Sequence, residues 1–145
     1  MDVHASLDTE CDADRLFALV DDLGQYPAWM DLTHRVDAED GSVPAAWQVE
    51  LRARIGPLAR SKRLRMERSA HDAADRAVVF ERAEGDGKRH SQWVLRAHVT
   101  QRGKSSRLDM HLHYGGALWT GGVLERVLAD QITSGRDRLQ QLVNE

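Results

Sequence analysis

The stretch from about residue 31 to residue 114 alternates apolar and polar side chains almost throughout, and this pattern restricts the fold more than any other feature of the chain. Such alternation has the two-residue period of half-buried β-strands. Turn-forming residues interrupt it at Asp40-Gly41-Ser42, Gly56-Pro57, Asp72 to Asp75, Gly85-Asp86-Gly87 and Gly103-Lys104. Six strands fit between these turns, and strands joined by short turns pair as antiparallel neighbours.

Two of the turns predict hairpins with a defined register, because pairing must place inward residues opposite inward residues. Closing residues 47–55 onto 58–66 pairs Trp47 with Met66, Val49 with Leu64, Leu51 with Lys62 and, on the outer face, Glu50 with Arg63. Closing residues 93–102 onto 105–114 pairs Trp93 with Tyr114, Leu95 with Leu112, Ala97 with Met110, Val99 with Leu108 and, on the outer face, Arg96 with His111 and His98 with Asp109. Each hairpin therefore has one apolar face.

The strand near residues 76–83 has two possible inward faces. Either Val78, Phe80 and Arg82 or Val79 and Glu81 point towards the core. The size of Phe80 favours the first arrangement, because a large aromatic side chain gains most from burial.

The segments on either side of this stretch predict one more strand and three helices. Residues 3–11 alternate like a strand, which brings the predicted number of strands to seven. Residues 13–22 repeat apolar side chains at helical spacing, with Asp12 in the N-cap position and Gly24 after the helix. Residues 26–30 predict a short helical turn that directs Tyr26 and Trp29 to the core. Residues 123–143 predict a long amphipathic helix.

Gly135 lies on the apolar stripe of that last helix. A glycine there costs roughly 1 kcal/mol relative to alanine. We expect its missing side chain to let a ligand or the sheet approach closely.

Length and composition restrict the class of protein. A chain of 145 residues predicts one domain over residues 1–145. No apolar run approaches the roughly 18 residues of a membrane span, and the N-terminus lacks a signal-peptide layout, so we expect a cytoplasmic protein without stable membrane insertion. Cys11 is the only cysteine, which excludes an intrachain disulfide. A net charge of −3 does not suit a dedicated nucleic-acid binder. We expect a monomer or homodimer.

The order of strand, helix, short helix, six strands and long helix resembles the START-like superfamily known as SRPBCC. The segment Leu16-Phe17-Ala18-Leu19-Val20-Asp21-Asp22 followed by Tyr26-Pro27-Ala28-Trp29 carries the same resemblance, which covers essentially the whole chain. Within the superfamily, the chain looks most like small bacterial polyketide cyclase/dehydrase-like and coenzyme-Q-binding-like members.

The resemblance implies an α+β helix-grip fold. In that fold, a seven-stranded curved antiparallel sheet wraps around the long C-terminal helix, and two short helices lie between the first and second strands. It also implies a cavity between sheet and helix, which relatives use for lipids, quinones, sterols, plant hormones or polyketides. No catalytic motif of the relatives matches closely enough to transfer a role to a residue.

The inward-facing residues are predicted to line this cavity and to bind a small hydrophobic ligand. They are Trp29, Trp47, Val49, Leu51, Leu64, Met66, Phe80, Trp93, Leu95, Leu112, Tyr114, Leu128, Ile132 and Gly135. The alternative is that the same residues fill a solid core, as apolar stripes usually do. The family resemblance favours the cavity.

Polar residues on the inward face suggest further chemistry. Arg60 and Lys62 share the phase of Leu64, so they either pair with an anionic headgroup or extend past the core into water, and we prefer the second. If the ligand were a polyketide, Arg82 could polarise a carbonyl and Tyr114 could donate a proton, which makes them the candidate catalytic residues. The alternative for Tyr114 is a hydrogen bond within the protein.

Polar residues on the outer face have simple alternatives to a site. His98, His111 and His113 share one face and could ligate a metal, but Arg96 beside them repels a cation, so we expect solvated histidines and no metal. Arg52, Arg54, Arg63 and Arg65 form a basic patch that could touch RNA, an acidic protein or a membrane headgroup, or could simply be solvated. The glycine pairs at 115–116 and 121–122 predict a flexible connection rather than a phosphate site.

We therefore expect a protein that binds or carries a lipid, quinone or polyketide-like molecule without a cofactor. One alternative is a polyketide cyclase, aromatase or dehydratase that uses the same cavity. A second alternative is a toxin-like interaction module that acts through the basic patch. The sequence leaves open whether any reaction is catalysed.

Overall fold

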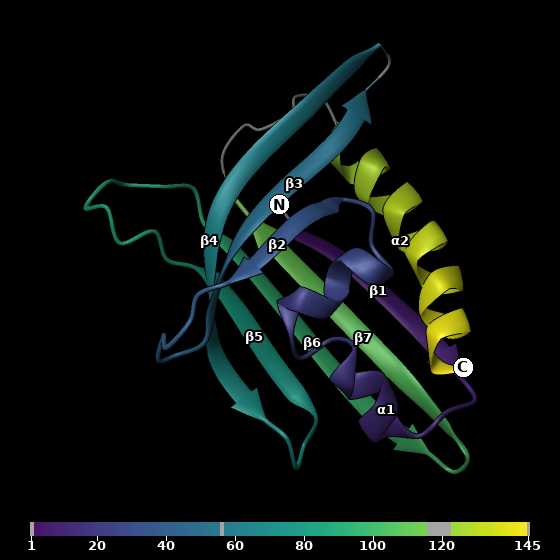
Figure 1. The fold of residues 1–145 in the computed structure, drawn as a ribbon. Helices are drawn as coiled ribbons and strands as arrows, with labels where there is room; N and C mark the ends of the chain where they lie inside the picture. The colour runs from purple at the N-terminus through teal and green to yellow at the C-terminus, as the bar shows by residue number, and fades with distance from the viewer. Residues whose placement is uncertain (1, 56, 116–122, 145) are drawn as a thin grey trace.

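The computed structural model describes residues 2–55, 57–115 and 123–144, and for residues 55, 123–125, 127–129 and 132 it describes the backbone alone. The elements in chain order are β1 (Asp2–Thr9), α1 (Ala13–Ala18), the 3-10 helix η1 (Leu23–Ala28), β2 (Thr33–Ala38), β3 (Ala46–Ile55), β4 (Leu58–Asp72), β5 (Ala77–Arg82), β6 (Trp93–Arg102), β7 (Ser105–Tyr114) and α2 (Val123–Val143). The predicted seven strands, two short helices and long last helix are confirmed (Figure 1).

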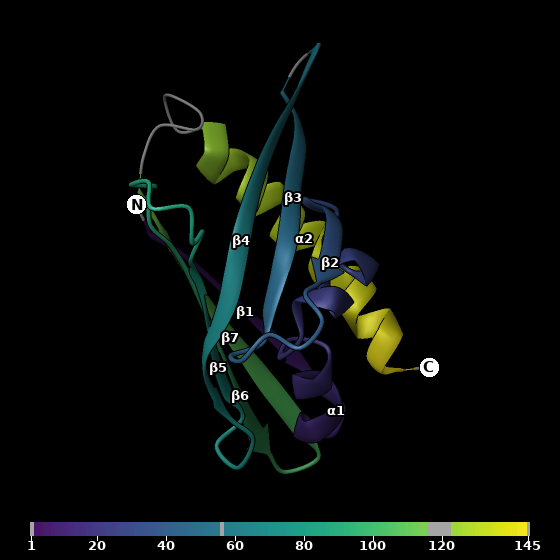
Figure 2. The ribbon, with the colours of Figure 1, turned by 60° about the vertical axis from the view of Figure 1, so that its left-hand side comes forward.

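All seven strands form one antiparallel sheet in the order β1-β7-β6-β5-β4-β3-β2. The sheet curls so that α1, η1 and α2 all lie on its concave side (Figure 2). This is the predicted helix-grip architecture. None of the helices among the described residues is long and apolar enough to cross a membrane.

Both predicted hairpins have the predicted register. β3 and β4 place Trp47 opposite Met66 and Leu51 opposite Lys62, and β6 and β7 place Trp93 opposite Tyr114. In β5, Val78 and Phe80 are almost fully buried, at 1% and 0% exposure, so the face that contains Phe80 points inward. The positions of the turns therefore predicted the strand pairing correctly, and the size of Phe80 predicted which face of β5 is buried.

The first helix is shorter than the predicted 13–22, because α1 ends at Ala18. Aromatic side chains from the following segment bind the carbonyl groups there: Trp29 Nε1 donates to Leu19 O at 3.1 Å and the Tyr26 hydroxyl donates to Val20 O at 2.8 Å. Asp12 precedes α1 as predicted but makes no side-chain capping bond. Instead, the backbone amide of Ala13 donates to Oε1 of Gln101 at 2.8 Å.

The helix α2 is fastened to the segment that follows η1. Side chains and backbone of residues 29–32 contact it at successive turns, and a further contact comes from α1. The contacts are Leu32 N donating to Gln131 Oε1 at 2.7 Å, an ion pair of Arg138 with Asp31, Gly135 against Trp29, and Arg15 donating to Leu142 O at 3.3 Å. These contacts hold α2 over the concave face.

Candidate functional site

A cavity of about 100 Å³ lies on the concave side of the sheet. Its described walls come from β1, β3, β4, β6 and β7 and from the segment that runs from η1 to the first residue of β2. The lining residues are Val3, Ala5, Leu23, Tyr26, Met30, Leu32, Thr33, Val49, Leu51, Leu64, Met66, Trp93, Leu95, Met110 and Leu112. Residues far apart in the chain therefore meet around one apolar space.

Among the described lining residues, the two side chains that carry a hydroxyl both use it within the protein. Tyr26 donates to Val20 O at 2.8 Å, and Thr33 Oγ1 donates to Met30 O at 2.6 Å. Burial, and secondarily the charges of Asp21 and Asp22, raises the pKa of Tyr26, so its hydroxyl stays protonated. Tyr26 is therefore a structural donor, and the body of the cavity offers a ligand apolar contacts.

Half of the predicted ligand-binding set lies around this space: Val49, Leu51, Leu64, Met66, Trp93, Leu95 and Leu112. Trp47 and Phe80 lie elsewhere on the concave face, where they pack edge to face with ring centroids 5.5 Å apart and fill the core. The side chains of Leu128 and Ile132 lie outside the described residues.

Trp29 and Gly135 lie together at the junction of η1 and α2. A Cβ built at Gly135 would lie 2.9 Å from the Trp29 carbonyl oxygen. The space left by the glycine is therefore occupied by the protein's own backbone, rather than by a ligand or by the sheet.

Several lining residues were not predicted. Val3, Ala5 and Met110 have the same alternation phase as the predicted inward residues of their strands, so the pattern contained a signal for them. Leu23 comes from η1, and Met30 and Leu32 come from the connection to β2; neither segment has a period long enough to show which side faces inward.

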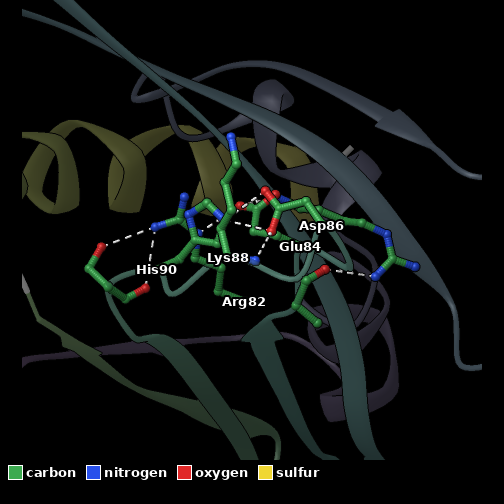
Figure 3. A network of polar contacts seen from close by, with 8 residues as sticks. Arg82, Glu84, Asp86, Lys88 and His90 are labelled. Atoms are coloured by element: carbon green, nitrogen blue, oxygen red, sulfur yellow. Dashed lines mark hydrogen bonds and ion pairs between the residues drawn. The ribbon is translucent and has the colours of Figure 1, made fainter.

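One end of the concave face carries a buried arginine (Figure 3). The Arg82 side chain is 8% exposed and its Nε donates to Glu84 Oε1 at 2.7 Å. Its NH1 nitrogen donates to the hydroxyl of Ser91 at 3.0 Å. Arg82 thus points inward, as predicted, and is positioned by a carboxylate partner that neutralises its charge.

Tyr114, the other candidate catalytic residue, lies two strands away from Arg82. Trp93 stands between them on β6, and its ring centroid is 5.4 Å from that of Tyr114. Strands two apart are about 10 Å from one another, so the two candidates flank Trp93 without being immediate neighbours. Neither belongs to the described lining of the cavity.

Two donors at this end have no protein acceptor in the part of the chain that the structure describes. Trp93 is 4% exposed and its Nε1 makes no hydrogen bond. Lys62 pairs with the lining residue Leu51 across the hairpin and is half-buried. Burial, reinforced by the nearby charge of Arg82 and only partly opposed by that of Glu84, holds the pKa of Lys62 below its ordinary value. An acceptor or anion supplied by a ligand would satisfy these groups.

The outer-face histidines bind carboxylates of the chain. His111 Nε2 and His113 Nδ1 lie 2.7 Å and 3.0 Å from the same Asp2 oxygen, and His98 lies 3.6 Å from Asp75. Among the described residues, no group of three or more histidine, cysteine, aspartate or glutamate side chains has an arrangement that could hold a metal ion.

The predicted basic patch is divided by the structure. Arg65 forms ion pairs with both Glu39, at 2.9 Å, and Glu67, at 2.7 Å, so its charge is already neutralised within the protein. Arg52, Arg54 and Arg63 are exposed.

Comparison with known proteins identifies the family of this chain and its fold. The sequence profile of the family described as polyketide cyclase / dehydrase and lipid transport matches residues 1–144. None of the curated proteins matches the chain.

Solved structures give the same architecture. The Zhui aromatase/cyclase from Streptomyces sp. R1128 has a TM-score of 0.69 at 13% identity, over 99% of this chain and 93% of that one. Major latex-like protein 151 from Panax ginseng has a TM-score of 0.69 at 16% identity, over 99% and 97%. The di-domain ARO/CYC BexL from the BE-7585A biosynthetic pathway has a TM-score of 0.67 at 15% identity, over 99% and 46%. At these identities the likeness shows the fold alone.

Proposed function

The chain belongs to the polyketide cyclase/dehydrase and lipid transport family, and from this membership we propose that it binds a small hydrophobic molecule in the cavity on the concave face of its sheet. The observation that carries the proposal is the apolar cavity whose two lining hydroxyl groups are already hydrogen-bonded within the protein. Such a space favours an apolar ligand, because a polar one would lose its hydrogen bonds to water without replacement.

The unpartnered donors suggest the chemistry of the ligand. Among the residues that the structure describes, Trp93 Nε1 has no acceptor and half-buried Lys62 has no ion-pair partner. A carboxylate or ketone oxygen at this end would accept hydrogen bonds that the described residues leave unmade. The proposed ligand class is therefore an apolar chain or ring system that ends in an anionic or carbonyl group, such as a fatty acid or a polyketide.

The size of the cavity adds a requirement. At about 100 Å³ it is smaller than the roughly 300–1,000 Å³ of typical small-molecule pockets. A ligand of more than a few carbon atoms must therefore displace part of the wall.

Thermal unfolding with a matched ligand panel tests the proposal. The panel contains one long-chain carboxylic acid, its methyl ester and the corresponding alcohol. At a hundred times its dissociation constant, a specific ligand stabilises the fold by about 2.7 kcal/mol, which raises the Tm by roughly 5–10 °C for a domain of this size. The proposal fails if no apolar compound raises the Tm and native mass spectrometry of protein purified from its host shows no bound molecule.

A second candidate is a cyclase or dehydratase that uses the same cavity. The donors at the Lys62 and Trp93 end favour it, because a developing enolate or alkoxide would need such stabilisation. Tyr114→Phe is the sharper test of this candidate, because Arg82→Ala also breaks the mostly buried pair with Glu84 and endangers folding. Turnover of a poly-β-ketone analogue that is unchanged in a folded Tyr114→Phe protein would exclude Tyr114 as the acid.

A further inference from the structure

The hairpin of β3 and β4 extends beyond the rest of the sheet (Figure 1). β2 pairs with β3 only as far as Leu51, and β5 pairs with β4 only as far as Met66. Beyond these points the two strands pair with each other, apart from a hydrogen bond from Arg52 N to Leu32 O and the bonds that join Arg65 to Ala83 and Glu84. We call residues 52–54 and 57–63 the arm. Among the described residues of the arm only Ala53 belongs to the buried core, so most of the arm's sequence is free to serve another purpose.

The charge of the arm and its base is strongly one-sided. Residues 51–66 contain six basic residues and no acidic one. Removing these six from the 20 basic residues of the chain leaves 14 against 23 acidic ones, so the rest of the protein has a formal charge of −9. The basic charge is therefore concentrated on one projection of an otherwise acidic molecule.

Most of this charge is unpaired. Of the six basic residues, Arg65 is bound by Glu39 and Glu67. The other five make no hydrogen bond or ion pair through their side chains with any residue that the structure describes. Arg52, Arg54 and Arg63 alternate with the buried residues of their strands and face outward, whereas Arg60 and Lys62 share the inward phase. The arm is thus cationic on both faces.

An exposed apolar residue stands at the end of the arm. Leu58, which begins β4 directly after Pro57, is 59% exposed. The nearest basic residues along the hairpin are Arg54 on β3 and Arg60 on β4. An exposed apolar side chain at the end of a basic hairpin matches the boundary of an anionic bilayer, where acyl chains lie below negatively charged headgroups.

We propose that the arm docks on the surface of an anionic lipid bilayer, with Leu58 at the acyl boundary and the arginines among the headgroups. The contact is peripheral, since the arm is one short hairpin. Single-stranded RNA fits less well, because residues 51–66 contain no aromatic side chain on which a base could stack. The arm also begins beside Leu51 and Leu64, which line the cavity, so docking would bring the cavity close to the lipid.

Co-sedimentation of the full chain with vesicles tests this inference. The probe vesicles are phosphatidylcholine alone and phosphatidylcholine mixed with phosphatidylserine. We expect binding to the mixed vesicles only, with an affinity that falls as salt is added. The triple variant Arg52→Gln, Arg54→Gln, Arg60→Gln should bind the mixed vesicles roughly a hundredfold more weakly, at about fivefold per arginine. Leu58→Ser should weaken binding without changing its salt dependence.

The matched control removes the same charge elsewhere. Arg89, Arg96 and Arg102 are exposed and lie outside the arm, so their replacement by glutamine should leave vesicle binding within about twofold. Equal losses in both triple variants, or no preference of the wild type for phosphatidylserine, would overturn the proposal, as would binding of RNA in place of vesicles. Vesicle binding needs no ligand in the cavity, so this experiment and the ligand panel fail independently.

Discussion

Gly135 of α2 lies directly against the backbone of Trp29. A Cβ at position 135 would lie 2.9 Å from the Trp29 carbonyl oxygen and 3.5 Å from its ring atom Cε3. Trp29 is itself fixed, because it is 3% exposed and its Nε1 donates to Leu19 O. The long helix therefore packs directly against the backbone and ring of Trp29, at the one position of its apolar stripe that has no side chain.

Replacing Gly135 with alanine should therefore destabilise the protein. Helix propensity alone would favour alanine by about 1 kcal/mol, but the methyl group meets a backbone atom that cannot rotate away. We expect a net loss of about 1–3 kcal/mol in the free energy of unfolding, measured by urea denaturation. The neighbouring Ser134→Ala is the control and should change stability by less than about 0.5 kcal/mol, because Ser134 is exposed. A raised midpoint for Gly135→Ala would contradict this packing.

Leu95 allows the cavity to be filled or enlarged at one position. It lies on β6, faces the cavity and is only partly buried by the protein itself. Leu95→Trp should occupy the space and abolish the thermal stabilisation by an apolar ligand, whereas Leu95→Ala should retain it. Isothermal titration of both variants with the same fatty acid measures the difference. Equal affinities would show that the ligand binds elsewhere.

The strand arrangement could be predicted because the register of each hairpin depends only on residues close together in the sequence. Across a short turn, either alternate set of side chains can face the core. Only one of the two sets places Trp47 opposite Met66, and only one places Trp93 opposite Tyr114, so the apolar side chains decide which face is buried. Phe80 decided the face of β5 by its size alone. No contact between distant parts of the chain was needed for these predictions.

The end of the first helix could not be predicted, because contacts with later residues decide it. The periodicity of residues 13–22 continues past Ala18, but the side chains of Tyr26 and Trp29 hydrogen-bond the carbonyls of Val20 and Leu19. Tertiary contacts of this kind override local propensity.

The division of the inward residues between cavity and solid core was also beyond the sequence. Phe80 and Leu95 share the inward face, and they pair directly across β5 and β6. One is completely buried among aromatic rings and the other lines the cavity. The difference depends on where Trp47, Tyr26 and α2 lie, and side-chain alternation carries no information about that.

The edge strand β1 should loosen in acid through Asp2. Hydrogen bonds from His111 and His113 hold the pKa of Asp2 below its ordinary 3.8. A carboxyl group whose folded pKa is lowered contributes stability above its unfolded pKa of about 3.9, and this contribution is lost as the pH falls through the folded pKa. The protection factors of the β1 amides, which are exchange rates corrected for the intrinsic effect of pH, should therefore fall as the pH drops through the folded pKa of Asp2. Asp2→Asn should exchange faster at neutral pH and lose this acid-dependent step.

Lys62 should select ligands that carry a negative charge. Burial and the charge of Arg82 hold its pKa below the ordinary 10.5, and a bound carboxylate would favour its charged form. Lys62→Met keeps the apolar stem, so it should weaken binding of a long-chain carboxylate about tenfold while leaving its methyl ester unchanged. For the wild type, carboxylate binding should persist at neutral pH and decline as the pH rises through the lowered pKa of Lys62. Arg60→Gln, one position outward on the same face, is the matched control and should leave both affinities unchanged. If the ester is weakened as much as the carboxylate, Lys62 acts through packing rather than charge.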